Sequence, residues 1–222
     1  MRLALPTGEE TTGLTEDHMA DHWRWRSGWR PGRRKYTWYF TFGGHQEVRD
    51  LAAGYQARLA ALPGLDPIPA RWLHLTVQGV GFTDEVSDED VTALLAASAG
   101  RLKDFAAQRV TLGPALVAPE AILLEVMPTD GLAAIRHELR EAIADVLGPA
   151  RLAGTAEWMP HVSVAYSHGT APMAPYLAAV ADGGTAETVL STVELMVLGR
   201  DHRLYEWTTR GKAQLTGAPQ TS

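Results

Sequence analysis

The 222-residue sequence contains no cysteine. Disulfides, thiolate nucleophiles and cysteine-ligated zinc or iron–sulfur sites are therefore excluded, and any chemistry has to come from other side chains. The sequence also lacks an apolar run long enough to cross a bilayer and a charged-then-apolar secretory start. We therefore expect a cytoplasmic protein without a membrane partner.

Acidic residues are missing from one stretch of a chain that is acidic overall. The net charge is −6, yet residues 23–35 (WRWRSGWRPGRRK) combine six basic residues with three tryptophans and no acid. An acidic body repels long polyanions, which argues against an extended duplex partner and favours a small or terminal phosphate substrate. The basic stretch either binds such a substrate or clamps a loop onto the acidic body, and we favour the clamp. Arg33 and Arg34, directly before the first predicted strand, are its best candidates for substrate contact.

Three regions are predicted: a partly disordered leader at 1–35, poorly ordered over 1–22; a single domain at 36–210; and a tail at 211–222. Alternation and β-branched or aromatic runs predict strands at 36–42, 72–80, 110–117, 121–126, 161–166, 189–198 and 205–209. Apolar spacings of three and four predict helices at 46–62, 87–99, 132–147 and 175–180. This order predicts an α+β fold with two pseudo-symmetric lobes, each an antiparallel sheet with outer helices, and an active-site cleft between them.

Two segments about 87 residues apart share one pattern. Residues 72–78 (WLHLTVQ) and 158–165 (WMPHVSVA) each contain a tryptophan, then histidine, aliphatic, hydroxyl and aliphatic residues. Residues i and i+2 of a strand share a face, roughly 6 to 7 Å apart. Each histidine is therefore predicted to share the cleft face with its hydroxyl partner. The same alternation adds Tyr39 and Gln78 as substrate-binding candidates.

The bare His-x-Ser/Thr pattern is common. With eight histidines and 27 serines and threonines, about one chance occurrence is expected, and three are present. The third, at residues 168–170, has a glycine at its centre and is interpreted as a decoy. The other two stand in corresponding places of the two halves. The remaining histidines, His22 and His45 among them, are expected to be structural or surface residues.

The paired motifs at residues 74–77 (HLTV) and 161–164 (HVSV) resemble the 2H phosphoesterase superfamily, in particular its 2′-5′ RNA ligase-like and 2′,3′-cyclic phosphodiesterase branches. The resemblance implies a bilobal α+β fold in which the motifs face each other across a cleft. It also implies nucleotide or RNA phosphodiester chemistry without a metal. Two features depart from the family: Ser163 replaces the commoner threonine, and the basic leader lies outside the common core.

Histidines in opposite protonation states suit hydrolysis of a 2′,3′-cyclic phosphate or a 2′-5′ linkage, because one can act as base and the other as acid. His74 and His161 are the predicted catalytic residues, and Thr76 and Ser163 the predicted phosphate donors. Neither motif carries a further ligand at metal spacing, so no metal or cofactor is expected. We expect a monomer. The sequence leaves open which histidine is the acid, and two alternative functions: a non-catalytic nucleotide or phosphometabolite binding module, and an RNA 2′-5′ ligase or tRNA-processing factor.

Overall fold

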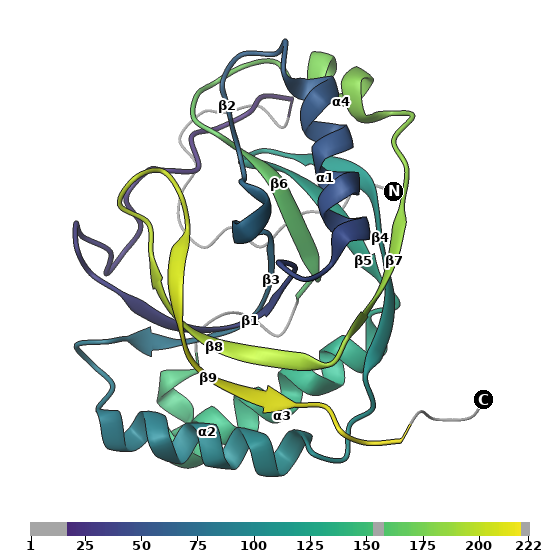
Figure 1. The fold of residues 1–222 in the computed structure, drawn as a ribbon. Coiled ribbons are helices and arrows are strands. Elements are labelled where there is room, and N and C mark those ends of the chain that lie inside the picture. The colour runs from purple at the N-terminus through teal and green to yellow at the C-terminus, as the bar shows by residue number, and fades with distance from the viewer. Residues whose placement is uncertain (1–16, 153–157, 219–222) are drawn as a thin grey trace.

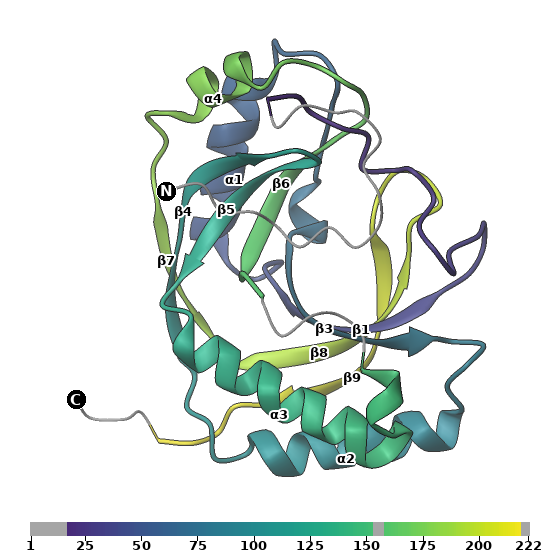
Figure 2. The same ribbon diagram turned by 180° about the vertical axis from the view of Figure 1, so that it is seen from behind.

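A computed structural model describes residues 17–152 and 158–218 of the chain (Figures 1 and 2). Its nine strands form one strongly curled sheet in the order β7-β4-β5-β6-β3-β1-β8-β9, with β2 added beside β6. All neighbouring strands run antiparallel. Within the described residues, no helix is both long and apolar enough to span a membrane.

The sheet divides into two lobes where β3 meets β6. The first lobe contains the strands β2 (Leu65–Pro67), β6 (His161–Ser167), β5 (Ala121–Met127), β4 (Gln108–Ala118) and β7 (Ala186–Leu190), with the helices α1 (Gln46–Leu59) and α4 (Ala174–Val180). The second contains β3 (His74–Phe82), β1 (Lys35–Thr41), β8 (Thr192–Gly199) and β9 (Glu206–Gln214), with α2 (Asp88–Leu102) and α3 (Asp130–Leu147). Short 3₁₀ turns at Ala70–Trp72 and Pro149–Arg151 complete the elements.

In both lobes the helices lie on the outside of the curled sheet (Figures 1 and 2). The helix-facing residues of the strands belong to one core with the apolar stripes of the helices, which leaves the inner faces of the two lobes turned toward each other. The predicted α+β fold with antiparallel sheets and outer helices is confirmed. The boundary of α2 follows from its sequence, because Ser87 and Asp90 form a reciprocal capping box.

Two element predictions were wrong at the C-terminal end of the chain. Residues 189–198, predicted as one strand, belong to β7 of the first lobe and β8 of the second, with Ser191 between them. The apolar alternation continues through this break without glycine or proline, so no local signal marks the crossing. Strand β9 continues to Gln214 and Leu215 is buried, so the folded unit extends past residue 210.

The described part of the leader packs on the body. Met19 is buried, and its backbone N–H donates to the carbonyl of Ala171. His22 is buried as well, and its N–H donates to the carbonyl of Ser167 in β6. The prediction that residues 1–22 are poorly ordered is therefore wrong for residues 17–22. Residues 1–16, to which the same prediction applied, are outside the described part of the chain.

Candidate active site

The two histidine motifs meet where β3 of one lobe pairs with β6 of the other. Leu75 of β3 and Val162 of β6 are antiparallel partners, and both are fully buried in the core. The same register sets His74 opposite Ser163, and Thr76 opposite His161, on the other face of the strands. Directly opposed residues have Cβ atoms about 4.5 to 5.5 Å apart. The structure thus brings the four motif side chains together as two cross-strand pairs.

Both imidazoles are fixed in the same way. The Nδ1 atom of His74 lies 2.8 Å from the carbonyl oxygen of Trp72, and Nδ1 of His161 lies 2.9 Å from that of Met159. Because a carbonyl oxygen only accepts hydrogen bonds, each Nδ1 carries a proton and donates it. In the neutral imidazole the Nε2 atom then keeps its lone pair. Both histidines therefore offer Nε2 as the atom that can take or give a proton.

Burial governs the charge of the pair. It lowers the pKa of His74 to about 4, an effect that the nearby His161 and His22 reinforce by charge repulsion and the bond to Trp72 partly opposes. Burial also lowers the pKa of His161. Both rings are therefore neutral in the free protein at neutral pH. An anion bound between them would raise both pKa values again, because an opposite charge favours the protonated form.

Each motif hydroxyl lies beside a tyrosine of its own lobe. Thr76 is the cross-strand partner of Tyr39 on β1, and Ser163 lies three residues before Tyr166 on β6; each hydroxyl acts to lower the pKa of its tyrosine, against the larger effect of burial. Burial raises the pKa of both tyrosines, so both phenols stay protonated. Tyr39, one of the predicted substrate-binding residues, is thus beside the histidine pair. The two lobes thus supply the tyrosine differently, from the neighbouring strand in one and from the same strand in the other.

Gln78 does not line the cleft, contrary to the alternation argument. A β-bulge interrupts β3, because Tyr39 pairs with Thr76 while the preceding Trp38 pairs with Gln78. The extra residue turns Gln78 to the core side, where it is buried and its Oε1 accepts from Arg140 of α3 at 3.2 Å. A strict two-residue period cannot anticipate such a bulge.

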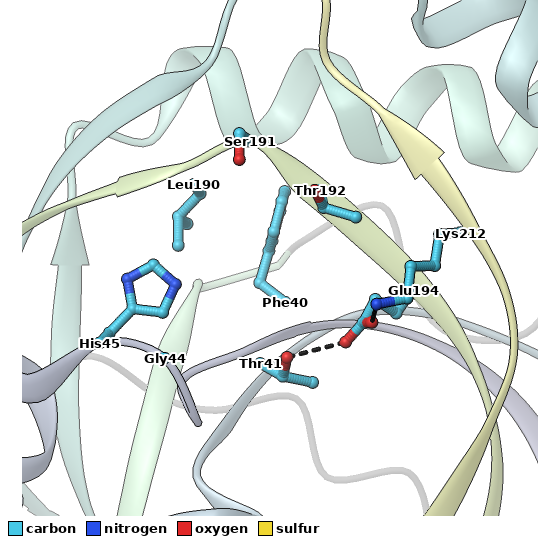
Figure 3. Close-up of a pocket in the computed structure, with 9 residues that line it drawn as sticks. All are labelled: Phe40, Thr41, Gly44, His45, Leu190, Ser191, Thr192, Glu194 and Lys212. Atoms are coloured by element: carbon cyan, nitrogen blue, oxygen red, sulfur yellow. Dashed lines mark hydrogen bonds and ion pairs between the residues drawn. The ribbon is translucent and has the colours of Figure 1, made fainter.

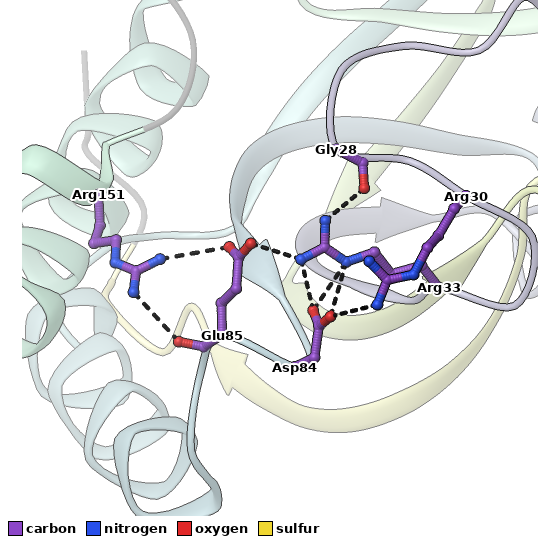
Figure 4. Close-up of polar contacts among 6 residues, drawn as sticks. All are labelled: Gly28, Arg30, Arg33, Asp84, Glu85 and Arg151. Carbon is purple, nitrogen blue, oxygen red and sulfur yellow. Dashed lines mark hydrogen bonds and ion pairs between the residues drawn. The ribbon is translucent and has the colours of Figure 1, made fainter.

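Arg33 and Arg34 lie far from the histidines. The guanidinium of Arg33 covers the ring of Phe82 at 3.6 Å and forms ion pairs with Asp84 and Glu85 (Figure 4). Phe82 ends the strand that His74 begins, eight residues and about 26 Å away. Arg34 pairs with Asp201 at 2.7 Å, at that same far end. Both arginines fasten the leader to the body.

The tryptophans of the leader surround one arginine. Arg200 is buried, and its guanidinium carbon lies 5.6 to 6.0 Å from the ring centres of Trp23, Trp25 and Trp29. Its Nη2 donates to the backbone carbonyl of His22 at 3.0 Å. These cation–π and hydrogen-bond contacts agree with the interpretation of the leader as a clamp rather than a free binding surface.

His22 is the residue that the sequence did not reveal. Its ring stacks on Tyr166 with centroids 4.1 Å apart, its Nε2 lies 3.0 Å from the hydroxyl of Tyr205, and its Nδ1 lies 3.4 Å from Glu120. Tyr205 in turn touches the ring of His74 edge-on, at 6.1 Å between centroids. A third histidine thus joins the surroundings of the pair. It comes from a segment with no periodic pattern, so no sequence signal pointed to it.

Metal-ligating side chains do not gather here. Within residues 17–152 and 158–218, no group of three or more histidine, aspartate or glutamate side chains is placed to hold a metal ion. The polar groups at the junction of the lobes are two imidazoles, two motif hydroxyls and two phenols. These groups are suited to proton transfer and to hydrogen bonds with an anion.

Two antiparallel lobes joined at paired His-x-hydroxyl motifs define the class of protein, a phosphoesterase fold of the 2H type. Residues 44–202 match the profile of the 2′-5′ RNA ligase superfamily, and the chain belongs to that superfamily. The leader and β1 lie before the matched region. A comparison with curated proteins gave no match.

Solved structures share the fold at low sequence identity. TT0787 of Thermus thermophilus superposes with a TM-score of 0.66 at 20% identity, covering 82% of this chain and 98% of that one. Escherichia coli LigT complexed with NADP⁺ gives a TM-score of 0.63 at 18% identity, covering 83% and 99%. A structure described as a phosphoesterase gives 0.64 at 18% identity, with the same coverage. At sequence identities of 18 to 20%, the similarity to these structures establishes a shared fold and nothing further.

Proposed function

We propose that the chain is a metal-independent phosphodiesterase that hydrolyses a 2′,3′-cyclic phosphate or a 2′-5′ linkage of a nucleotide or RNA end. The observation that carries the proposal is the register of β3 and β6, which sets His74 across from Ser163 and Thr76 across from His161. The substrate class draws support from relatives in fold, because Escherichia coli LigT is described in complexes with NADP⁺, 3′-AMP and ATP.

The proposed reaction is an in-line displacement at phosphorus. Nε2 of one histidine accepts a proton from water while the water oxygen forms the new bond to phosphorus. The bond from phosphorus to the ribose oxygen breaks, and the protonated second histidine gives that oxygen its proton. The products are a phosphate monoester and a free ribose hydroxyl. Each proton transfer typically contributes about 10²- to 10⁴-fold.

The motif hydroxyls have a separate role in the proposal. Thr76 and Ser163 each donate a hydrogen bond to a non-bridging phosphate oxygen, where charge develops in the transition state. In this proposal the neighbouring phenols of Tyr39 and Tyr166 orient these hydroxyls when the phosphate is bound. The lowered pKa values of His74 and His161 suit the base directly. The acid gains its proton when the bound phosphate anion raises its pKa.

The test is hydrolysis of a panel of 2′,3′-cyclic nucleotides and 2′-5′-linked dinucleotides in EDTA. We expect turnover to survive the chelator and to fall by orders of magnitude in both His74→Ala and His161→Ala. His137→Ala is the matched control, because His137 is exposed on the outer helix α3. Absence of turnover on every substrate, with nucleotide binding retained in both variants, would indicate a binding module instead.

A further inference from the structure

A polar pocket of about 180 Å³ lies at the crossing from β7 to β8, between the ends of strands from both lobes (Figure 3). Its walls come from the end of β1, the loop before α1, the crossing from β7 to β8, and β9. The lining side chains that carry polar groups are Thr41, His45, Ser191, Thr192, Glu194 and Lys212. None of these residues has a role in the reaction proposed above.

The sheet register fixes the position of this pocket relative to His74. Thr41 is the direct cross-strand partner of His74, so their side chains share the cleft face. Glu194 is the partner of Tyr39, whose ring stacks on His74 with centroids 4.3 Å apart. Since neighbouring strands are about 4.8 Å apart, Thr41 on β1 lies roughly 5 Å from His74, Glu194 on β8 roughly 10 Å and the backbone of Lys212 on β9 roughly 14 Å. A nucleoside can span the interval from a phosphate at His74 to Glu194, which the long Lys212 side chain reaches from β9.

The centre of the pocket is a carboxylate beside an ammonium group. The Glu194 side chain is 10% exposed, and its two oxygens accept from the Thr41 hydroxyl at 2.8 Å and pair with Lys212 Nζ at 2.7 Å (Figure 3). Each carboxylate oxygen has two acceptor positions, so each keeps one free. Lys212 is 56% exposed and has two further N–H donors. Glu194 and Lys212 together carry no net charge. The pocket is therefore poorly suited to a second phosphate and better suited to an uncharged group that has hydrogen-bond donors next to an acceptor.

We propose that this pocket binds the nucleobase of the nucleotide whose phosphate lies between His74 and His161, an inference that rests on the proposed function. Glu194 accepts from N–H groups of the base edge, and Lys212 donates to a neighbouring carbonyl. The pocket therefore prefers guanine, which presents two N–H donors beside its O6 carbonyl, over uracil, which presents a single N–H.

The test is kcat/KM for the four 2′,3′-cyclic nucleoside monophosphates with wild type, Glu194→Gln and Lys212→Met. We expect wild type to prefer guanosine over uridine by about tenfold or more, because a hydrogen bond to a charged group is at stake. Glu194→Gln should lower the guanosine value by about tenfold and leave the uridine value within about threefold. Equal effects on all four substrates, or no effect, would overturn the assignment.

Control variants separate an effect on folding from an effect on catalysis. Lys212 is half exposed, so Lys212→Met changes the pocket without altering a buried side chain. Thermal melting shows whether Glu194→Gln and Lys212→Met are both folded. Glu138→Gln is the matched control, because Glu138 pairs with Arg101 between the outer helices.

A binding experiment measures base preference without turnover. In it, 3′-GMP and 3′-UMP are titrated into the His74→Ala/His161→Ala double variant, with and without Glu194→Gln. If guanine is bound more tightly than uracil only when Glu194 is present, but wild type hydrolyses no substrate, then the base-binding pocket is supported and the phosphodiesterase is refuted. If wild type hydrolyses the cyclic nucleotides without preferring a base, then the phosphodiesterase is supported and the pocket assignment is refuted.

Discussion

The imidazole of His74 is stacked on the phenol ring of Tyr39, with centroids 4.3 Å apart and planes inclined by 22°. Tyr39 is also the direct cross-strand partner of Thr76, so one residue of β1 lies against both members of the first motif. Trp207 packs edge-on against both rings, 5.1 Å from the imidazole centroid and 5.4 Å from that of Tyr39. This aromatic enclosure removes water from His74, and desolvation is the main reason why its pKa is low.

Two substitutions of Tyr39 separate its ring from its hydroxyl. Tyr39→Phe keeps the stack and should lower kcat by about tenfold, since Thr76 loses its orienting partner. Tyr39→Ala also removes a fully buried ring and should cost about 3 to 5 kcal/mol of stability. Steady-state kinetics and urea unfolding measure the two effects. A Tyr39→Phe variant with wild-type kcat would show that the phenol has no part in the reaction.

The low pKa of His74 makes stability depend on pH in a defined window. In the unfolded chain its pKa is 6.5, and in the folded protein it is about 4. Between these values the unfolded state binds the proton and the folded state does not, so stability falls as pH drops from 6.5 to 4, by up to about 3 kcal/mol. Urea unfolding at several pH values should show this loss, and His74→Asn should show a shallower slope. An unchanged slope in that variant would contradict the assignment.

The two motif hydroxyls give a matched pair of substitutions. Thr76→Val and Ser163→Ala each remove one donor to the phosphate, and each should lower kcat by about 10²- to 10³-fold. Thr76 is exposed, so its replacement should change stability by less than about 0.5 kcal/mol. Ser163→Thr is the control and should retain activity, because it keeps the donor. Wild-type kcat in both donor-free variants would remove the hydroxyls from the proposed mechanism.

The shared faces of the motif residues could be predicted because local periodicity holds there. His74 and Thr76, and His161 and Ser163, are each two residues apart on a strand, and their shared face follows from that spacing. The spacing cannot show that Leu75 and Val162 pair, which is a long-range contact that sets the two motifs in register.

Other features depend on the tertiary structure alone. The bulge that turns Gln78 to the core arises from the pairing of β3 with β1. The partners of Arg33 lie more than 50 positions along the chain, so its ion pairs were invisible to a local reading. The crossing at Ser191 separates two strands whose residues continue one apolar pattern, and only the packing of each lobe assigns them.

Arg33 offers a test of the anchoring role of the leader. Arg33→Ala removes ion pairs with Asp84 and Glu85 and the contact with Phe82, so the melting temperature should fall. Its effect on kcat/KM for a cyclic nucleotide should stay within about twofold, because the side chain packs on Phe82, eight residues along β3 from His74. Arg109→Ala, at an exposed position of β4, is the matched loss of one charge. A large rise in KM at unchanged stability would instead restore Arg33 as a substrate-binding residue.

His22 should be the inner attachment of the same segment. His22→Ala removes the stack on Tyr166 and leaves the Tyr205 hydroxyl without its partner, so we expect a loss of about 1 to 3 kcal/mol in stability. The leader should also become sensitive to trypsin at Arg24 and Arg26, which limited proteolysis with mass spectrometry would detect. His22→Phe keeps the stack alone and should be intermediate. If the leader of His22→Ala stays as protected as that of wild type, then the tryptophan contacts of Arg200 suffice to hold it and His22 is not the attachment.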